Sequence, residues 1–176
     1  MFSLNQANET LSKDPRIKEI KLKRKFPGQI NIHIVPKTVA ASMMSFKFGL
    51  HSLTKEADIL PVNLSLQNLD LPILRGANFH KQKELRTLAV KLLEEVPAKG
   101  LFSRENISEI RYENKNGFII YLNSHNSIIK LGKNEFKKKS SYIERAMSYL
   151  ESQKMEGRVI DARYSKKVVV KLRNEP

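Results

Sequence analysis

The sequence contains no cysteine and no tryptophan. Without cysteine, the chain can form no disulfide, no thiolate metal site and no cysteine nucleophile, although this absence assigns no compartment. No apolar run approaches the roughly 18 residues that cross a bilayer, and the N-terminus lacks the basic-then-apolar layout of a signal peptide. We therefore expect the chain, as written, to be soluble.

The sequence motifs of common enzymes are missing as well. It has no HExxH pair, no glycine-rich phosphate loop and no GxSxG elbow, and only seven glycines. Glu94 and Glu95 are adjacent on a predicted helix, so their side chains diverge by about 100°. The histidines stand apart from one another in the sequence: His33, His51, His80 and His125. We expect a protein that is not an enzyme and that binds no metal or cofactor.

Positive charge dominates what is present. Lysine and arginine number 32 against 18 acidic residues, a net charge of +14. Residues 13–25 alone hold seven basic and two acidic side chains. Such a surface attracts nucleic acid, anionic lipid, acidic polymers or acidic protein partners. A solvated basic surface without a single polyanion site explains the composition equally well.

The first forty residues predict a small helix–strand–strand unit. A short helix at 5–12 ends at Asp14-Pro15, and the strand "IKEIKLKRK" follows. "FPGQ" is a turn, and "INIHIV" is a second strand with Ile30, Ile32 and Ile34 facing inward. The chain then continues as an extended connector through "VPKTVAASMMSFKF".

The remaining residues predict a mainly antiparallel sheet with two helices on one face. A hairpin turns around 54–57, a loop covers 68–78, and apolar residues at spacings of three and four predict a helix at 81–96. The strands "ISEIRYE" and "GFIIYLN" flank an Asn-Gly turn, and "SIIKLG" follows. A second helix at 134–153 precedes the strands "RVIDARY" and "KKVVVKL". The fold class is therefore α+β.

The last of these strands stands out as a candidate binding site. Its run of valines is flanked by Lys166, Lys167 and Lys171, and the chain ends soon afterwards. An edge strand offers unpaired N–H and C=O groups to another chain, whereas lysines on an edge discourage indiscriminate pairing. The sequence leaves two interpretations open: a strand that receives a partner, and a protected edge without one. In the first case we expect proline at Val169 to block the partner and leave the fold intact.

Several segments together resemble the extracytoplasmic part of the bacterial cell-division family FtsQ/DivIB. "LSKDPRIKEIKLKRKFPGQINIHIV" looks like the end of that family's POTRA domain, and "TVAAS" stands where the family has Pro-Val-Ala. "LDLPILRG" is similar to its Leu-Pro-x-Leu-x-Gly loop. "ISEIRYENKNGFIIYL", "IIKLG" and "FKKK" follow in the family's order, and "VIDARYSKKVVVK" resembles its Asp-x-Arg-Tyr ending. The resemblance covers nearly the whole chain and implies a partial POTRA-like domain at 1–40 and an FtsQ-type β domain at 41–176.

The resemblance implies a division scaffold that recruits the small proteins FtsB and FtsL, with FtsB adding as a further strand. The residues it assigns to partner binding are Arg163, Tyr164, Lys166, Val169, Val170, Lys171 and Leu172. The helix around 142–150 is expected to support the same site, and the hairpin at 21–34 to act in recruitment. In the family a cytoplasmic tail, a transmembrane helix and the start of the POTRA domain come before the matching segments, and we expect none of them within this sequence. The implied location is the extracytoplasmic face of the plasma membrane.

A basic nucleic-acid-binding domain is the alternative to the scaffold. Single-strand binders combine basic grooves with exposed aromatic side chains. Several aromatic residues here are expected to face inward, among them Phe118, Tyr121 and Phe136, and no helix-turn-helix or RNA-recognition signature occurs. We therefore expect nucleic-acid binding to be the weaker hypothesis.

Overall fold

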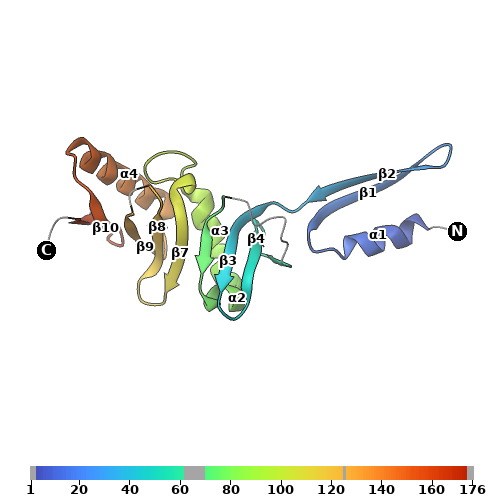
Figure 1. Ribbon diagram of the computed structural model, residues 1–176, viewed down its shortest axis with the longest axis horizontal. Helices are drawn as coiled ribbons and strands as arrows, with labels where there is room; N and C mark the ends of the chain where they lie inside the picture. The colour runs from blue at the N-terminus through green and yellow to red at the C-terminus, as the bar shows by residue number, and fades with distance from the viewer. Residues whose placement is uncertain (1–2, 62–69, 125, 174–176) are drawn as a thin grey trace.

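Two separate β-sheets lie one after the other along the chain. The computed structural model describes residues 3–61, 70–124 and 126–173. One helix and a two-stranded sheet form the N-terminal end of an elongated molecule, and a nine-stranded sheet with its helices forms the rest of the described chain (Figure 1). This arrangement confirms the predicted α+β class.

The N-terminal unit consists of α1 (Leu4–Ser12), β1 (Ile17–Lys25) and β2 (Gln29–Pro36), as predicted. Just after the helix, Asp14 accepts hydrogen bonds from the backbone N–H and the guanidinium of Arg16. The expectation that the β2 isoleucines face an interior is wrong, because α1 packs mainly over β1 and does not bury them. Ile30, Ile32 and Ile34 are 40%, 56% and 45% exposed.

The larger sheet has the strand order β11-β10-β9-β8-β7-β6-β3-β4-β5. Neighbouring strands run antiparallel except for the pairs β9–β10, β3–β6 and β6–β7, which are parallel. The strands are β3 (Val39–Ser45), β4 (Gly49–Thr54), β5 (Ile59–Leu60), β6 (Ile73–Arg75), β7 (Ile107–Glu113), β8 (Gly117–Leu122), β9 (Ile128–Gly132), β10 (Gly157–Asp161) and β11 (Val169–Leu172).

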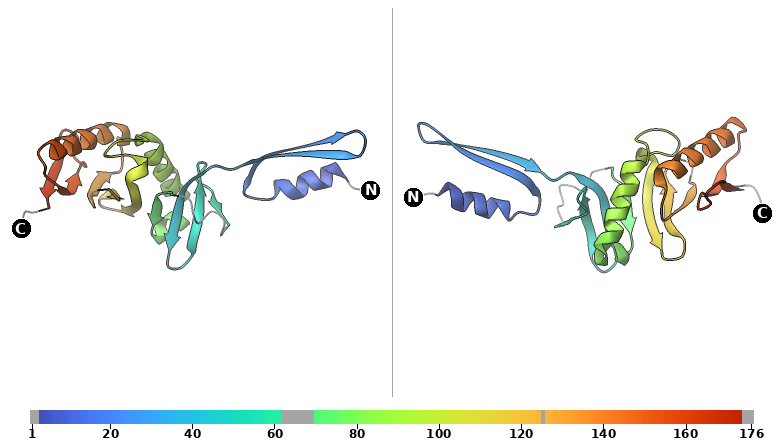
Figure 2. Two further views of the ribbon diagram at one scale, coloured as in Figure 1. Left: turned by 45° about the horizontal axis from the view of Figure 1, so that its top comes forward. Right: turned by 180° about the vertical axis from the view of Figure 1, so that it is seen from behind.

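Helices cover one face of this sheet and leave the other face open (Figure 2). They are α2 (Ala77–Lys81), α3 (Lys83–Glu95) and α4 (Phe136–Ser152), and a short 3-10 helix, η2 (Arg104–Asn106), precedes β7. Leu85, Leu92, Ile143 and Met147 point from the helices into the core, which explains the apolar spacing seen in the sequence. No helix in the described part of the chain combines the length and apolarity needed to cross a bilayer.

Two segments of the large sheet differ from their prediction. The expected connector contains β3, which lies between β4 and β6 inside the sheet. Its residues are all uncharged, so the sequence lacks the alternation of apolar and charged residues that marks a half-exposed strand. The expected loop at 68–78 contains β6, a strand of only three residues between Pro72 and Gly76. Residues 68 and 69 lie outside the described residues.

Candidate partner-binding edge

Strand β11 forms one edge of the nine-stranded sheet. It pairs antiparallel with β10, and no other strand of the described chain lies on its outer side. The prediction of a final strand at the sheet edge is therefore confirmed. The strand begins at Val169, so Lys166 and Lys167 belong to the preceding loop.

The register fixes which backbone groups of β11 face outward. The Ala162 N–H donates to the Lys130 carbonyl, so Ile160 and Ala162 direct their backbone groups toward β9. Because successive residues of a strand alternate, Asp161 and Val159 direct their backbone N–H and C=O groups toward β11. There they pair with Val169 and Lys171.

The residue after β11 continues the same alternation. The Arg173 N–H donates to the Glu156 carbonyl, again toward β10. The backbone N–H and C=O groups of Val170 and Leu172 consequently point to the open edge.

Side chains of β11 alternate between the two faces of the sheet. Val169 is 46% exposed and shares the helix-free face with the exposed Lys171. Val170 packs against the hydrophobic core, and Leu172 is half-buried on the same side. The predicted site residues therefore split into an outward pair, Val169 and Lys171, and an inward pair that supports the strand.

Arg163 is held by its neighbours. Its Nη2 lies 2.5 Å from Oδ2 of Asp161, its Nε lies 2.9 Å from Oδ1, and its Nη1 donates to the Asn116 side chain. Burial raises the pKa of Asp161, but the hydrogen bonds from Arg163 outweigh burial and keep that pKa below its ordinary value. The same hydrogen bonds raise the pKa of Arg163. Because Asp161 already neutralises the charge of Arg163, we do not expect Arg163 to act as a charge partner for a bound strand.

Tyr164, Lys166 and Lys167 are exposed in the loop between β10 and β11. The Tyr164 ring is 46% exposed, and the ammonium group of Lys167 lies 5.4 Å from its centroid. An aromatic side chain and two cations thus stand next to the open edge.

Asp161 and Asn116 also lie at this edge, and the sequence did not identify them as site residues. The Asp-x-Arg spacing in the sequence could have identified Asp161 as a partner of Arg163. Asn116 could not be found in this way, because it lies in a turn 47 residues away from Arg163.

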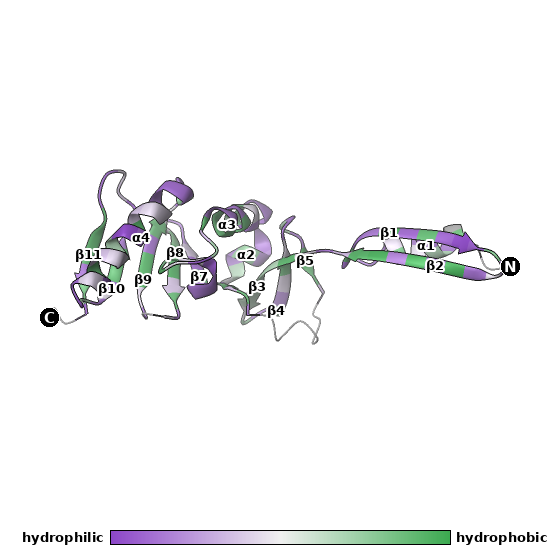
Figure 3. Cartoon of the chain, turned by 90° about the horizontal axis from the view of Figure 1, so that it is seen from above, coloured by the Kyte–Doolittle hydropathy of each residue, from purple (hydrophilic) through white to green (hydrophobic). Residues whose placement is uncertain are grey.

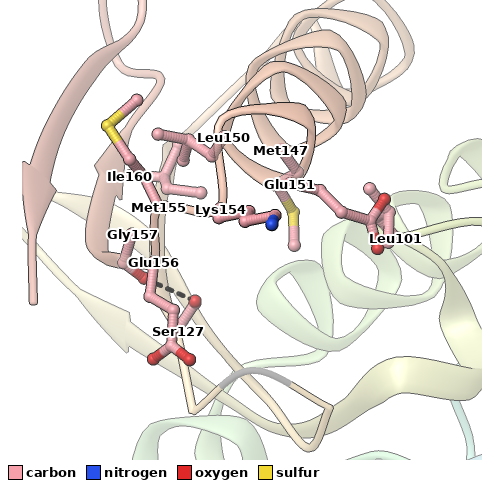
Figure 4. Close-up of a pocket in the computed structure, with 10 residues that line it drawn as sticks. All are labelled: Leu101, Ser127, Met147, Leu150, Glu151, Lys154, Met155, Glu156, Gly157 and Ile160. Carbon is pink, nitrogen blue, oxygen red and sulfur yellow. Dashed lines mark hydrogen bonds between the residues drawn. The ribbon is translucent and has the colours of Figure 1, made fainter.

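Helix α4 supports the edge from behind through a close approach at Gly157. A Cβ at this glycine would lie 3.1 Å from Leu150 Cδ1 and 3.3 Å from Val170 Cγ1. Beside this contact a cavity of about 250 Å³ opens between α4 and β10, with Met147, Leu150 and Ile160 on its apolar side (Figure 4). Ser127 Oγ donates to the Gly157 carbonyl at 2.6 Å and ties β10 to the chain before β9.

The histidines are less scattered than expected. The rings of His51 and His80 lie 5.5 Å apart, and His80 also stacks on Phe48. His33 is exposed on β2, and His125 lies outside the described residues. Among the described residues no group of three or more histidine, aspartate or glutamate side chains could hold a metal ion.

Comparison with known proteins places these features in one family. The model of "Cell division protein FtsQ/DivIB, C-terminal" matches residues 48–163, and that of "POTRA domain, FtsQ-type" matches residues 1–35. A Cell division protein FtsQ from Geobacter sp. (strain M21) is 26% identical over 169 residues, covering 92% of this chain and 61% of the relative. One from Geotalea daltonii is 22% identical over 176 residues, covering 96% and 63%. The chain thus spans less than two thirds of the length of these relatives.

Proposed function

We propose that this chain, which belongs to the FtsQ/DivIB family of cell-division proteins, is a non-enzymatic scaffold that binds FtsB-like and FtsL-like partners. A segment of the FtsB-like partner pairs with β11 as an additional strand. The observation that carries the proposal is the outward direction of the Val170 and Leu172 backbone groups, which meet no strand of the described chain. Strand addition satisfies such groups and gives the complex its register.

The side chains beside this edge favour a partner that is acidic and partly apolar. Val169 offers an apolar contact on the helix-free face, and Lys171 next to it offers a positive charge. The loop before the strand adds one aromatic ring and two positive charges, from Tyr164, Lys166 and Lys167. Arg163 donates hydrogen bonds to Asp161, and this contact fixes the path of the chain into the loop.

The proposed location is the extracytoplasmic face of the plasma membrane, where a division scaffold meets small membrane-anchored partners. The proposal assigns recruitment and positioning to this chain. It assigns no chemical step to any side chain.

The decisive experiment removes one outward N–H of β11. Proline is tolerated on an edge strand where the N–H faces solvent, so Val170→Pro removes the group that a partner strand needs. Val170→Ala is the matched control, because it loses the same side chain but keeps the N–H. Titration calorimetry with the extracytoplasmic part of the FtsB-like protein from the same genome is expected to give at least about tenfold weaker binding for proline than for alanine.

The register corrects the substitution that the sequence suggested. Proline at Val169 removes an N–H that faces β10, so it disturbs the β10–β11 hairpin itself and is a poor test of the outer edge. Tyr164→Glu, which adds negative charge in the exposed loop, is the second probe and is expected to weaken binding of an acidic partner. Equal affinity of Val170→Pro and Val170→Ala would rule out strand addition at β11. Binding to duplex DNA that falls steeply with salt would instead support the nucleic-acid alternative.

A further inference from the structure

The β1–β2 hairpin carries a row of lysines on one face. The strand alternation puts Lys21, Lys23 and Lys25 on this face, and β2 places His33, Asn31 and Gln29 opposite them. All six side chains are exposed. Lysines two residues apart in a strand stand about 7 Å from one another, so the row presents three charges over roughly 14 Å. Figure 3 shows the hydrophilic and hydrophobic residues along the two strands.

Little negative charge balances this row. Glu19 forms an ion pair with Lys21, with its Oε1 2.6 Å from Nζ. From Ile20 to Lys55 the sequence contains no aspartate or glutamate. Lys23 and Lys25 therefore lie in a stretch of chain that has no acidic residue of its own, and the hairpin is attracted as a unit to an anionic surface.

The hairpin ends in an exposed aromatic side chain. Phe26 follows the lysine row directly and is 94% exposed. An aromatic ring of this size buries on the order of 150–250 Å² when it is covered. Full exposure of a phenylalanine at the tip of a hairpin therefore leaves a large apolar surface in water.

The placement of the tip allows it to reach a flat surface. In all views the hairpin projects from the nine-stranded sheet, and its turn lies at the same end of the molecule as the N-terminus (Figures 1 and 2). Helices α2, α3 and α4 and the candidate partner-binding edge lie toward the opposite end. A surface that contacts Phe26 therefore leaves β11 accessible.

We propose that the β1–β2 hairpin binds an anionic lipid surface, with Phe26 entering the headgroup region and Lys21, Lys23 and Lys25 contacting lipid phosphates. A basic row followed by an apolar tip fits the layered chemistry of a bilayer interface, which is charged outside and apolar beneath. Proteins that bind single-stranded nucleic acid instead combine a basic groove with several aromatic rings. This hairpin has only one phenylalanine and no tyrosine. The proposal does not depend on the proposed function of β11.

The absence of tryptophan makes the test direct. Phe26→Trp introduces a single fluorescent reporter at the tip. Phe46→Trp is the matched control, because Phe46 is equally exposed but lies in the turn of the β3–β4 hairpin. With vesicles of phosphatidylcholine containing about one third phosphatidylglycerol, the emission of the Phe26→Trp variant is expected to shift to the blue and to be quenched by brominated lipid. The Phe46→Trp variant is expected to show neither change.

Co-sedimentation with the same vesicles measures the two contributions separately. Replacing Lys21, Lys23 and Lys25 by glutamine is expected to weaken binding roughly 100-fold, at about fivefold for each lysine near an anionic surface. Phe26→Ser is expected to weaken it about tenfold. Glutamine at Lys166, Lys167 and Lys171, at the other end of the molecule, removes the same number of charges and is expected to change vesicle binding less than about twofold.

Three results would overturn the proposal. The first is an unchanged emission spectrum of the Phe26→Trp variant in the presence of anionic vesicles. The second is an equal loss of vesicle binding after the Lys166, Lys167 and Lys171 substitutions, which would mean that only net charge matters. The third is a duplex oligonucleotide that binds the hairpin more tightly than vesicles at matched salt, which would make nucleic acid the partner.

Discussion

The Arg163 guanidinium is hydrogen-bonded to the carboxylate of Asp161, two residues earlier in the chain, with Nη2 2.5 Å from Oδ2. The Arg163 backbone N–H donates to the same carboxylate at 3.1 Å. Asp161 ends β10, and the loop to β11 begins just after it. The pair therefore sets the direction in which the chain leaves β10, and with it the position of the edge strand.

Asp161→Asn is expected to destabilise the fold by about 1–2 kcal/mol at pH 7, because amide groups form weaker hydrogen bonds with arginine than carboxylates do. The pKa of Asp161 is lowered in the folded state, so its stabilisation is complete above the ordinary carboxyl pKa of about 4 and is lost as the pH falls through the lower folded-state value. Urea unfolding at several pH values measures the difference between the variant and the parent.

The control for this prediction is Glu156→Gln, which removes the exposed ion pair between Glu156 and Arg173 on the same hairpin. This change is expected to stay within about 0.5 kcal/mol. A difference between Asp161→Asn and the parent that persists unchanged at pH 2.5 would contradict the assignment.

Glu144 connects α4 to the segment that follows α3. Its two carboxylate oxygens accept the backbone N–H groups of Leu101 at 3.0 Å and Phe102 at 2.7 Å. Glu144→Gln offers only one acceptor oxygen, so it leaves one of these N–H groups unpaired and is expected to cost about 1–3 kcal/mol in the free energy of unfolding. Hydrogen exchange at Leu101 and Phe102 is expected to accelerate, whereas the exposed Glu151→Gln on the same helix is expected to have little effect. Unchanged exchange at both amides would argue against the contact.

Much of the fold could be predicted because its elements carry strong local signals. The α3 stripe of Leu85, Ala89 and Leu92 follows the helical period, and all three are buried. Gly117 has a φ of 74°, and the Asn-Gly pair in the sequence predicts a turn with such a positive φ. β3 gave no such signal, because its open face carries Ser42 and Met44 in place of charged residues, so the sequence shows no clear alternation of apolar and polar positions. β6 was not predicted, because three residues between a proline and a glycine have the sequence pattern of a loop.

The candidate edge could be predicted only in part. The valines and lysines identified a strand, and the sheet order confirms that this strand is at the edge. The direction of the Val169 and Val170 backbone groups depends on how β10 pairs with β9, which the sequence of β11 does not contain. The neutralisation of Arg163 by Asp161 requires their side chains to fold back on one another, and spacing alone does not decide this.

His80 is expected to make stability depend on pH. Burial lowers the pKa of His80, the neighbouring His51 lowers it further, and neither buried ring nitrogen of His80 has a hydrogen-bond partner among the described residues. The folded state therefore favours the neutral ring, so stability is complete above the ordinary histidine pKa of about 6.5 and falls as the pH drops below it.

His80→Phe keeps a ring against Phe48, whose centroid lies 5.0 Å from that of His80, and removes the titration. The free energy of unfolding of this variant is expected to vary less between pH 7.5 and pH 5.5 than that of the parent. Identical slopes for His80→Phe and the parent would show that another group is responsible.

Gly117 and Gly49 both have positive φ values, 74° and 75°, but differ in their surroundings. A Cβ at Gly117 would collide with the backbone of Gly132, 2.8 Å from its Cα, whereas nothing lies within 4 Å of a Cβ at Gly49. Gly49→Ala therefore meets only the backbone penalty of about 1–2 kcal/mol, while Gly117→Ala must also separate β8 from β9 and is expected to cost about 2–4 kcal/mol. Chemical denaturation of the two variants measures this difference directly. Equal destabilisation would mean that β8 and β9 are not packed this closely at Gly132, and the Asn116 side chain that contacts Arg163 would then lose its fixed position beside the edge.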